Sequence, residues 1–303
     1  MNFEVTILGS GSAMPTGRRN PASQFIQCCN RTVLIDCGEG TQVQIRRAGV
    51  KLQKIDHILI SHLHGDHFFG LVGLLSTMHL LGRDTGLTIY GPQGLKQIVL
   101  MQLEIGGAKL DFDLKFIELD GKTPGIIYED KMIEIHTFPL KHRILTNGYK
   151  ISEKPKERNI IGEALKEQGI SLQAVPFFRR GENYIDEDGI EHDVDDYTYA
   201  PKPSKSYAYC SDTKYTESIL PYIENVDVLY HEATFTDQHA GRAVSTMHST
   251  AKQAATIALK AHAKRLLMGH LSARYENGEE HEQEARAIFP ESKVVEDFDQ
   301  YFI

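Results

Sequence analysis

The sequence predicts an α/β fold that is interrupted by one inserted segment. Short apolar runs end in glycine or polar residues and lead into helical stretches, which is typical of α/β chains. This pattern stops at about residue 151 and resumes after Ser206. The chain has 303 residues, of which 41% are apolar and 24% charged, so it can bury a sizeable core in one or two domains.

The strands predicted in the first half are short and apolar. The first ends in Gly9-Ser10-Gly11 and the second in Asp36-Cys37-Gly38, and the third leads into Ser61-His62. The expected strands are Glu4–Leu8, Thr32–Ile35, His57–Ile60, Thr88–Tyr90 and Met132–Phe138.

The segment from 151 to 205 differs in composition from the rest of the chain. Charged residues cluster at 153–158, an acidic run extends from Asp186 to Asp196, and Pro201 and Pro203 close the segment. It is interpreted as an insertion, either a solvated surface loop or a protruding arm that grips a partner.

After the insertion the first pattern returns. Strands are predicted at Ser206–Cys210, Val226–Tyr230 and Arg265–Met268, with a helix over Ala251–Ala263. Because strands and helices alternate in both halves of the sequence, it is compatible with a fold of two similar halves.

Four possible metal ligands stand within six residues, in His62-x-His64-x-Asp66-His67. They follow an apolar strand directly, so alternate residues 62 and 64 point the same way if the strand continues. Imidazole and carboxylate without thiolate is typical of a catalytic zinc site. The segment therefore predicts ligands for two neighbouring metals.

Further candidate ligands follow later predicted strands, namely His142, Asp212 and His270. Groups at the carboxyl ends of strands in an α/β fold converge on one crevice. Together with the first motif they make a two-metal set of five histidines and two aspartates, in which one carboxylate can bridge.

These residues resemble the ligand signature of the metallo-β-lactamase superfamily, in the same order along nearly the whole chain. The resemblance implies a four-layer αβ/βα sandwich with the metals in the cleft between its halves. It also implies one zinc on His62, His64 and His142, another on Asp66, His67 and His270, and a bridging Asp212. Two Zn²⁺ per subunit are expected.

Several further motifs are similar to those of the ribonuclease Z family of tRNA 3′-processing endonucleases. They are Gly9-Ser10-Gly11 with Pro15-Thr16 and Arg19-Asn20, Asp36–Gln42, His231–Phe235, His248-Ser249-Thr250, and His270-Leu271-Ser272 with Arg274-Tyr275. The resemblance implies removal of the 3′ trailer from precursor tRNA, leaving a tRNA 3′-hydroxyl and a 5′-phosphate trailer.

The family also implies catalytic roles. Asp66 would hold and deprotonate the attacking water, and His248, oriented by Glu232, would protonate the leaving 3′ oxygen. Arg19 and Asn20 are expected in substrate or loop-positioning roles. The remaining expected substrate contacts are Arg179, Arg180 and Arg274.

In the family the insertion is a flexible tRNA-binding arm, and the enzyme is a homodimer. This arm departs from the pattern, because Gln173-Ala174-Val175-Pro176 replaces a Gly-Pro step and its acidic run suits RNA poorly. The net charge of −8 also lowers the expectation of a nucleic-acid partner.

Neither a basic leader nor a membrane span is visible: the longest apolar stretch, Phe68–Leu81, is too short to cross a bilayer. A cytoplasmic protein without a membrane partner is expected.

The alternatives to a tRNA-processing endonuclease are a small-molecule phosphodiesterase or arylsulfatase of the same superfamily and a non-catalytic RNA-binding protein. An oxygen-reducing di-iron relative is disfavoured, because it would carry Glu in place of His64.

Overall fold

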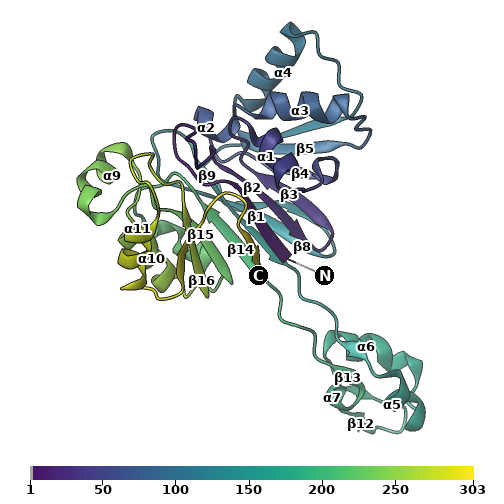
Figure 1. The fold of residues 1–303 in the computed structure, drawn as a ribbon. Helices are drawn as coiled ribbons and strands as arrows, with labels where there is room; N and C mark the ends of the chain where they lie inside the picture. The colour runs from purple at the N-terminus through teal and green to yellow at the C-terminus, as the bar shows by residue number, and fades with distance from the viewer. Residues whose placement is uncertain (1–2) are drawn as a thin grey trace. The chain divides into compact units, whose positions relative to one another are not determined.

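The computed structural model describes residues 3–303, and most of its strands lie in two seven-stranded sheets (Figure 1). The first sheet has the order β18-β1-β2-β3-β4-β5-β6, parallel from β3 to β6 and antiparallel elsewhere. Its strands are β1 (Phe3–Gly9), β2 (Ser23–Cys28), β3 (Arg31–Ile35), β4 (His57–Leu59), β5 (Leu87–Pro92), β6 (Leu114–Leu119) and β18 (Gln300–Phe302).

The second sheet has the order β17-β16-β15-β14-β9-β8-β7 and is parallel from β14 to β17. Its strands are β7 (Gly125–Glu129), β8 (Ile133–Pro139), β9 (Asn147–Glu153), β14 (Ser206–Cys210), β15 (Val228–Glu232), β16 (Arg265–Gly269) and β17 (Ser292–Val294).

Three apolar cores arrange these sheets and their helices into four layers. One core joins the two sheets face to face, with residues such as Ile35 from the first and Tyr207 from the second. The other cores lie under helices on the outer face of each sheet, which confirms the predicted αβ/βα sandwich. The helices are α1 (Thr41–Arg47), α2 (Gly65–Phe68), α3 (Leu71–Leu80), α4 (Leu95–Ile105), α8 (Leu220–Ile223), α9 (Ala240–Thr246), α10 (Ala251–Lys260) and α11 (Glu279–Arg286).

All the strands and the helix named from sequence are present, but the sequence pattern missed an antiparallel hairpin. Strands β2 and β3 are joined by Cys29 and Asn30, both with positive φ, of 50° and 63°. Two left-handed residues are the geometry of a tight hairpin turn, for which Asn-Gly is the usual sequence signal. Cys-Asn lacks that signal, so the sequence pattern does not reveal the turn.

Residues Glu153–Ser204 form a second compact unit. Its elements are β10 (Asn159–Ile160), α5 (Gly162–Glu167), α6 (Val175–Arg180), β11 (Tyr184–Ile185), β12 (Glu191–His192), α7 (Val194–Tyr197) and β13 (Thr198–Tyr199). A small core of its own holds it together, in which the Phe178 and Tyr197 rings stack 4.9 Å apart. The unit is therefore folded rather than an irregular loop.

Within residues 3–303, the helices are all too short or too polar to span a membrane.

Candidate metal centre and active site

The predicted ligands meet where strands of both sheets end. His62 and His64 follow β4, His142 follows β8, Asp212 follows β14, and His270 follows β16. Asp212 and His270 have left-handed backbones, with φ of 60° and 59°. Strained backbone of this kind clusters at functional sites, where it aims a side chain that an extended strand would point elsewhere.

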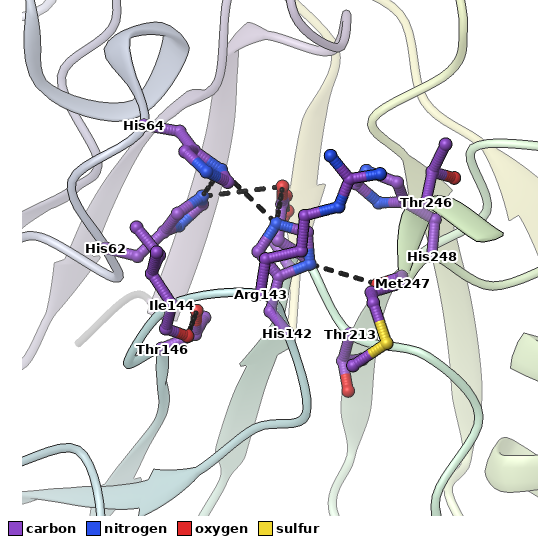
Figure 2. Close-up of polar contacts among 12 residues, drawn as sticks. His62, His64, His142, Arg143, Ile144, Thr146, Thr213, Thr246, Met247 and His248 are labelled. Atoms are coloured by element: carbon purple, nitrogen blue, oxygen red, sulfur yellow. Dashed lines mark hydrogen bonds and ion pairs between the residues drawn. The ribbon is translucent and has the colours of Figure 1, made fainter. Parts of the chain in front are cut away.

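The first group of ligands surrounds one point with imidazole nitrogens (Figure 2). His64 Nδ1 lies 2.9 Å from His62 Nε2 and 3.2 Å from His142 Nε2. Asp212 Oδ2 lies 3.5 Å from His62 Nε2 and 3.6 Å from His142 Nε2. A tetrahedral zinc with bonds of about 2.0–2.1 Å holds its donor atoms roughly 3.3 Å apart, so this set fits zinc.

The second group shares the other oxygen of the same aspartate. Asp212 Oδ1 lies 3.0 Å from His270 Nε2 and 3.2 Å from His67 Nε2. Asp66 Oδ2 completes the set, at 3.4 Å from His270 Nε2 and 3.5 Å from His67 Nε2. Since its two oxygens face different groups, Asp212 has the geometry of a bridging ligand.

Each of four candidate ligand histidines uses its second ring nitrogen for a fixed contact. His62 Nδ1 lies 3.0 Å from Ser61 Oγ, and His67 Nδ1 donates to Asp36 Oδ2 at 2.7 Å. His142 Nδ1 donates to the Met247 carbonyl at 3.0 Å, and His270 Nδ1 to Thr234 Oγ1 at 3.0 Å. Such contacts fix the tautomer and orientation that metal binding requires.

Burial keeps the first group of histidines neutral. It lowers the pKa of His62 to about 4, with a further contribution from His67, and it lowers the pKa values of His64 and His142. A neutral imidazole has a free lone pair, so these three residues are ready to bind a cation at neutral pH.

The second group is dominated by negative charge. Burial opposes a charge on His67, yet Asp212, Asp66 and Asp36 outweigh it and raise the pKa of His67 well above its ordinary value. Carboxylates that hold a proton so strongly on an imidazole would attract a metal cation in its place.

A histidine–carboxylate pair lies beside the ligands. Glu232 is fully buried, and its Oε1 accepts a 2.8 Å hydrogen bond from His248 Nδ1. Burial disfavours the charged ring, but Glu232 outweighs it and raises the pKa of His248 to about 9. The ring is 5.4 Å from that of His270 and 5.0 Å from that of His142, so a protonated group faces the centre.

An open pocket of about 510 Å³ gives access to these residues. Its lining includes Asp66, His142, Asp212, His248 and His270. Five of the seven predicted ligands and the predicted acid thus line one accessible space, and the other two, His62 and His67, are fully buried beside them.

The residues predicted to contact substrate differ in their surroundings. Arg19 is buried and forms an ion pair with Glu296, while Asn20 donates to Asp297 Oδ2 from its main-chain and side-chain nitrogens. Of the two roles expected for Arg19 and Asn20, these contacts favour loop positioning. Arg274 lies over the Phe235 ring, 5.3 Å from its centroid.

In the second unit, the arginines predicted to contact substrate both have acidic neighbours. Arg179 lies 3.5 Å from Glu157, and Arg180 lies 2.8 Å from Glu182. An RNA phosphate would have to replace these partners, and the predicted contacts stay predictions.

Sequence reasoning gave no role to Asp36, Thr234 or Met247. Asp36 holds His67, Thr234 links Glu232 to His270, and Met247 orients His142 through its carbonyl. The position of Asp36 at the end of a strand was a usable signal. A backbone carbonyl such as that of Met247 has no sequence signal.

Comparison with known proteins identifies relatives over nearly the full length of the chain. A ribonuclease Z of Parabacteroides distasonis is 44% identical over 95% of both chains, and that of Cytophaga hutchinsonii is 42% identical over 100% of this chain and 97% of its own. The chain belongs to the ribonuclease Z family. A family model described as "Anti-Pycsar protein Apyc1" also matches residues 3–143, which is less than half of the present chain.

Solved structures extend the family comparison to the fold. The short form of human tRNase Z superposes with a TM-score of 0.72 at 27% identity, covering 98% of both chains. YhfI of Bacillus subtilis, a metallo-β-lactamase fold protein, superposes with a TM-score of 0.71 at 19% identity over 100% of both chains, which is a likeness of fold alone. This ribonuclease Z family member therefore has the metallo-β-lactamase fold.

Proposed function

We propose that this chain is a metal-dependent endoribonuclease that removes the 3′ trailer from precursor tRNA. The observation that carries the proposal is the complete set of seven ligands with a histidine–carboxylate pair at its rim, in a member of the ribonuclease Z family. Loss of one ligand would have favoured a non-catalytic binding protein.

The two donor groups fit two Zn²⁺ per subunit. His62, His64 and His142 would hold one ion, Asp66, His67 and His270 the other, and Asp212 both. When bound, such ions lower the pKa of a bound water and neutralise charge on a phosphate.

The chain's own residues would handle the protons. The Asp66 carboxylate, held by the Ala13 main-chain N–H at 2.7 Å, would accept a proton from the attacking water. His248 would give the proton on its Nε2 to the leaving 3′ oxygen, while Glu232 stabilises the imidazolium before transfer. The products are a tRNA 3′-hydroxyl and a 5′-phosphate trailer.

The Glu153–Ser204 unit would bind the tRNA body, and the enzyme would act as a homodimer. The family resemblance motivates both proposals, and the unit's own folded core supports its role as a binding module. Its charge is a departure, because twelve acidic residues outnumber seven basic ones between 153 and 204.

The test uses purified protein, zinc and a precursor tRNA with a 3′ extension. We expect cleavage near the acceptor end that His64→Ala abolishes and that His248→Ala slows by about 10²–10⁴. Bis(p-nitrophenyl) phosphate is a control, because its good leaving group needs no acid, so His248→Ala should spare its hydrolysis. Hydrolysis of the control by a wild type that leaves precursor tRNA intact would make a small-molecule phosphodiesterase the better assignment.

A further inference from the structure

A second groove adjoins the active-site pocket. Its volume is about 680 Å³, and His142 and Arg143 line both spaces. One wall is the turn after β6 at residues 121–122, and the other is the end of β8 with the loop that follows it, at residues 139–146. Figure 2 shows the start of this loop, where Arg143 follows the candidate ligand His142.

The groove is positively charged in a chain whose net charge is −8. Lys122, Lys141 and Arg143 line it, and its lining includes no acidic residue. Asp120 precedes the turn, but its carboxylate accepts hydrogen bonds from the main-chain nitrogens of Lys122 and Thr123, both at 2.8 Å. Hydrogen bonds from Thr123 and Lys122 lower the pKa of this carboxyl to about 2, so it stays ionised and offsets part of the positive charge at the turn, although it lies outside the lining.

The two walls are held in place before any ligand binds. Gly121 has a φ of 65°, and a Cβ built on it would lie 3.0 Å from Leu145 Cβ, so the turn packs closely on the loop. The loop is fixed at its base by a hydrogen bond from Leu140 N to Thr146 O at 2.9 Å.

The cationic side of the loop is also anchored. Lys141 N donates to Thr213 Oγ1 at 3.1 Å, and Arg143 Nη2 donates to the Ser245 carbonyl at 3.1 Å. A preformed wall loses little conformational entropy when a ligand binds.

We propose that this groove binds the phosphates of the single-stranded 3′ trailer as it leaves the active site. The proposal rests on the proposed function. Proteins hold single-stranded nucleic acid in a positively charged groove that follows the backbone, commonly with aromatic side chains for the bases. Here the cationic groove is present, and aliphatic side chains take the place of aromatic ones. The exposed parts of Ile144 and Leu145 supply the apolar surface. On the other side of the scissile bond lies the base-paired acceptor stem, whose bases are not free to pack on such an apolar surface.

The test compares wild type with the double variant Lys122→Ala/Lys141→Ala, which leaves the metal ligands and Arg143 intact. Lys51→Ala/Lys54→Ala is the matched control, because both lysines are exposed and lie outside the groove. Substrates are precursor tRNAs with a trailer of one nucleotide or of about eight, within the usual site sizes for single strands. Binding of a 5′-phosphorylated RNA of the longer length is measured separately by fluorescence anisotropy.

We expect kcat/KM of the groove variant to fall roughly tenfold on the precursor with the long trailer and to change little on the precursor with the short trailer. Its affinity for the oligonucleotide should also fall roughly tenfold. The slope of log affinity against log salt should flatten by about 1.4, because each lost phosphate contact on a single strand removes about 0.7. Hydrolysis of bis(p-nitrophenyl) phosphate should be unchanged.

Equal losses on both trailer lengths, or no loss in oligonucleotide binding, would overturn the trailer assignment. Weaker binding of mature tRNA by the groove variant would assign the groove to the acceptor stem instead. Should wild type fail to cleave any precursor, the proposed function would fall. The oligonucleotide measurement would still decide whether the groove binds single-stranded RNA.

Discussion

At the scale of single residues, Asp36 controls the second donor group without belonging to it. It is fully buried, follows β3 with a φ of 56°, and accepts hydrogen bonds from Ser61 N, Tyr209 Oη and His67 Nδ1, each at 2.7 Å. One carboxylate therefore ties β3, the ligand loop and the second sheet to the ring of His67.

The variant Asp36→Asn should bind zinc about 10–100-fold more weakly, which is the usual effect of removing a partner of a ligand histidine. Competition with a chromogenic chelator measures this affinity. Asp56→Asn is the control, because Asp56 also accepts a main-chain hydrogen bond, from Thr32 N, away from the ligands. Equal zinc affinity in the two variants would refute the positioning role of Asp36.

His281 illustrates a second effect at this scale, the coupling of stability to pH. The ring is fully buried against Tyr275, and neither nitrogen has a hydrogen-bond partner within residues 3–303. Burial and the charge of Arg19 lower the pKa of His281 from 6.5 to about 4. Between pH 4 and pH 6.5, His281 is therefore neutral in the folded state and protonated in the unfolded chain.

Stability should be unaffected by His281 above pH 6.5 and should fall as the pH drops from 6.5 towards 4. A shift of this size corresponds to about 3 kcal/mol in the free energy of unfolding. His281→Leu should remove this part of the pH dependence, as measured by urea unfolding at several pH values. The control variant His79→Leu should keep this pH dependence. Parallel plots of unfolding free energy against pH for wild type and His281→Leu would contradict the prediction.

At the scale of elements, the start of α3 is packed so closely that it fixes the ligand helix before it. Gly70 precedes α3, and a Cβ built there would lie 2.1 Å from the Gly38 carbonyl oxygen. The Gly70 N–H also donates to the Cys37 carbonyl at 2.9 Å. Because α2 carries Asp66 and His67, this contact sets the distance between those ligands and the first sheet.

Gly70→Ala should therefore destabilise the fold by about 1–3 kcal/mol, the usual cost of overpacking. Gly241→Ala is a matched control in helix α9, since a Cβ there meets nothing within 4 Å. That control should be neutral or stabilising by up to about 1 kcal/mol, because alanine favours a helix. Urea denaturation of both variants measures the difference, and equal stability would show that the backbone yields at Gly70.

At the scale of the whole molecule, the Glu153–Ser204 unit is joined to the sandwich through neighbouring strands. Ser152 on β9 pairs with Ser206 on β14 in antiparallel register. The two chain ends that lead into the unit therefore leave adjacent positions of one sheet, and a short hairpin turn can join them.

Replacement of residues 154–204 by Asn-Gly should leave a folded sandwich, because its three cores lie outside the removed residues. Hydrolysis of bis(p-nitrophenyl) phosphate should persist. Cleavage of precursor tRNA should drop at least tenfold in kcat/KM, by our estimate for the loss of several phosphate contacts. Unchanged cleavage of precursor tRNA would remove the proposed role of this unit.

The sequence by itself determined the fold class, and it predicted the place of the insertion and seven candidate ligands that the structure brings together. These features leave local signals: apolar runs that end in polar residues, an abrupt change of composition, and four ligands spaced within six residues. Strand ends in an α/β fold converge, so the sequence pattern predicts that His142, Asp212 and His270 lie at the centre.

Tertiary structure alone decided how the candidate ligands are oriented and where the basic groove lies. The two oxygens of Asp212 face different donor groups, the Met247 carbonyl orients His142, and Lys122 joins Lys141 across a groove. Each of these contacts links residues distant in sequence or uses a backbone atom common to all residues. No local pattern can encode such a contact, because packing of the two sheets is what brings its partners together.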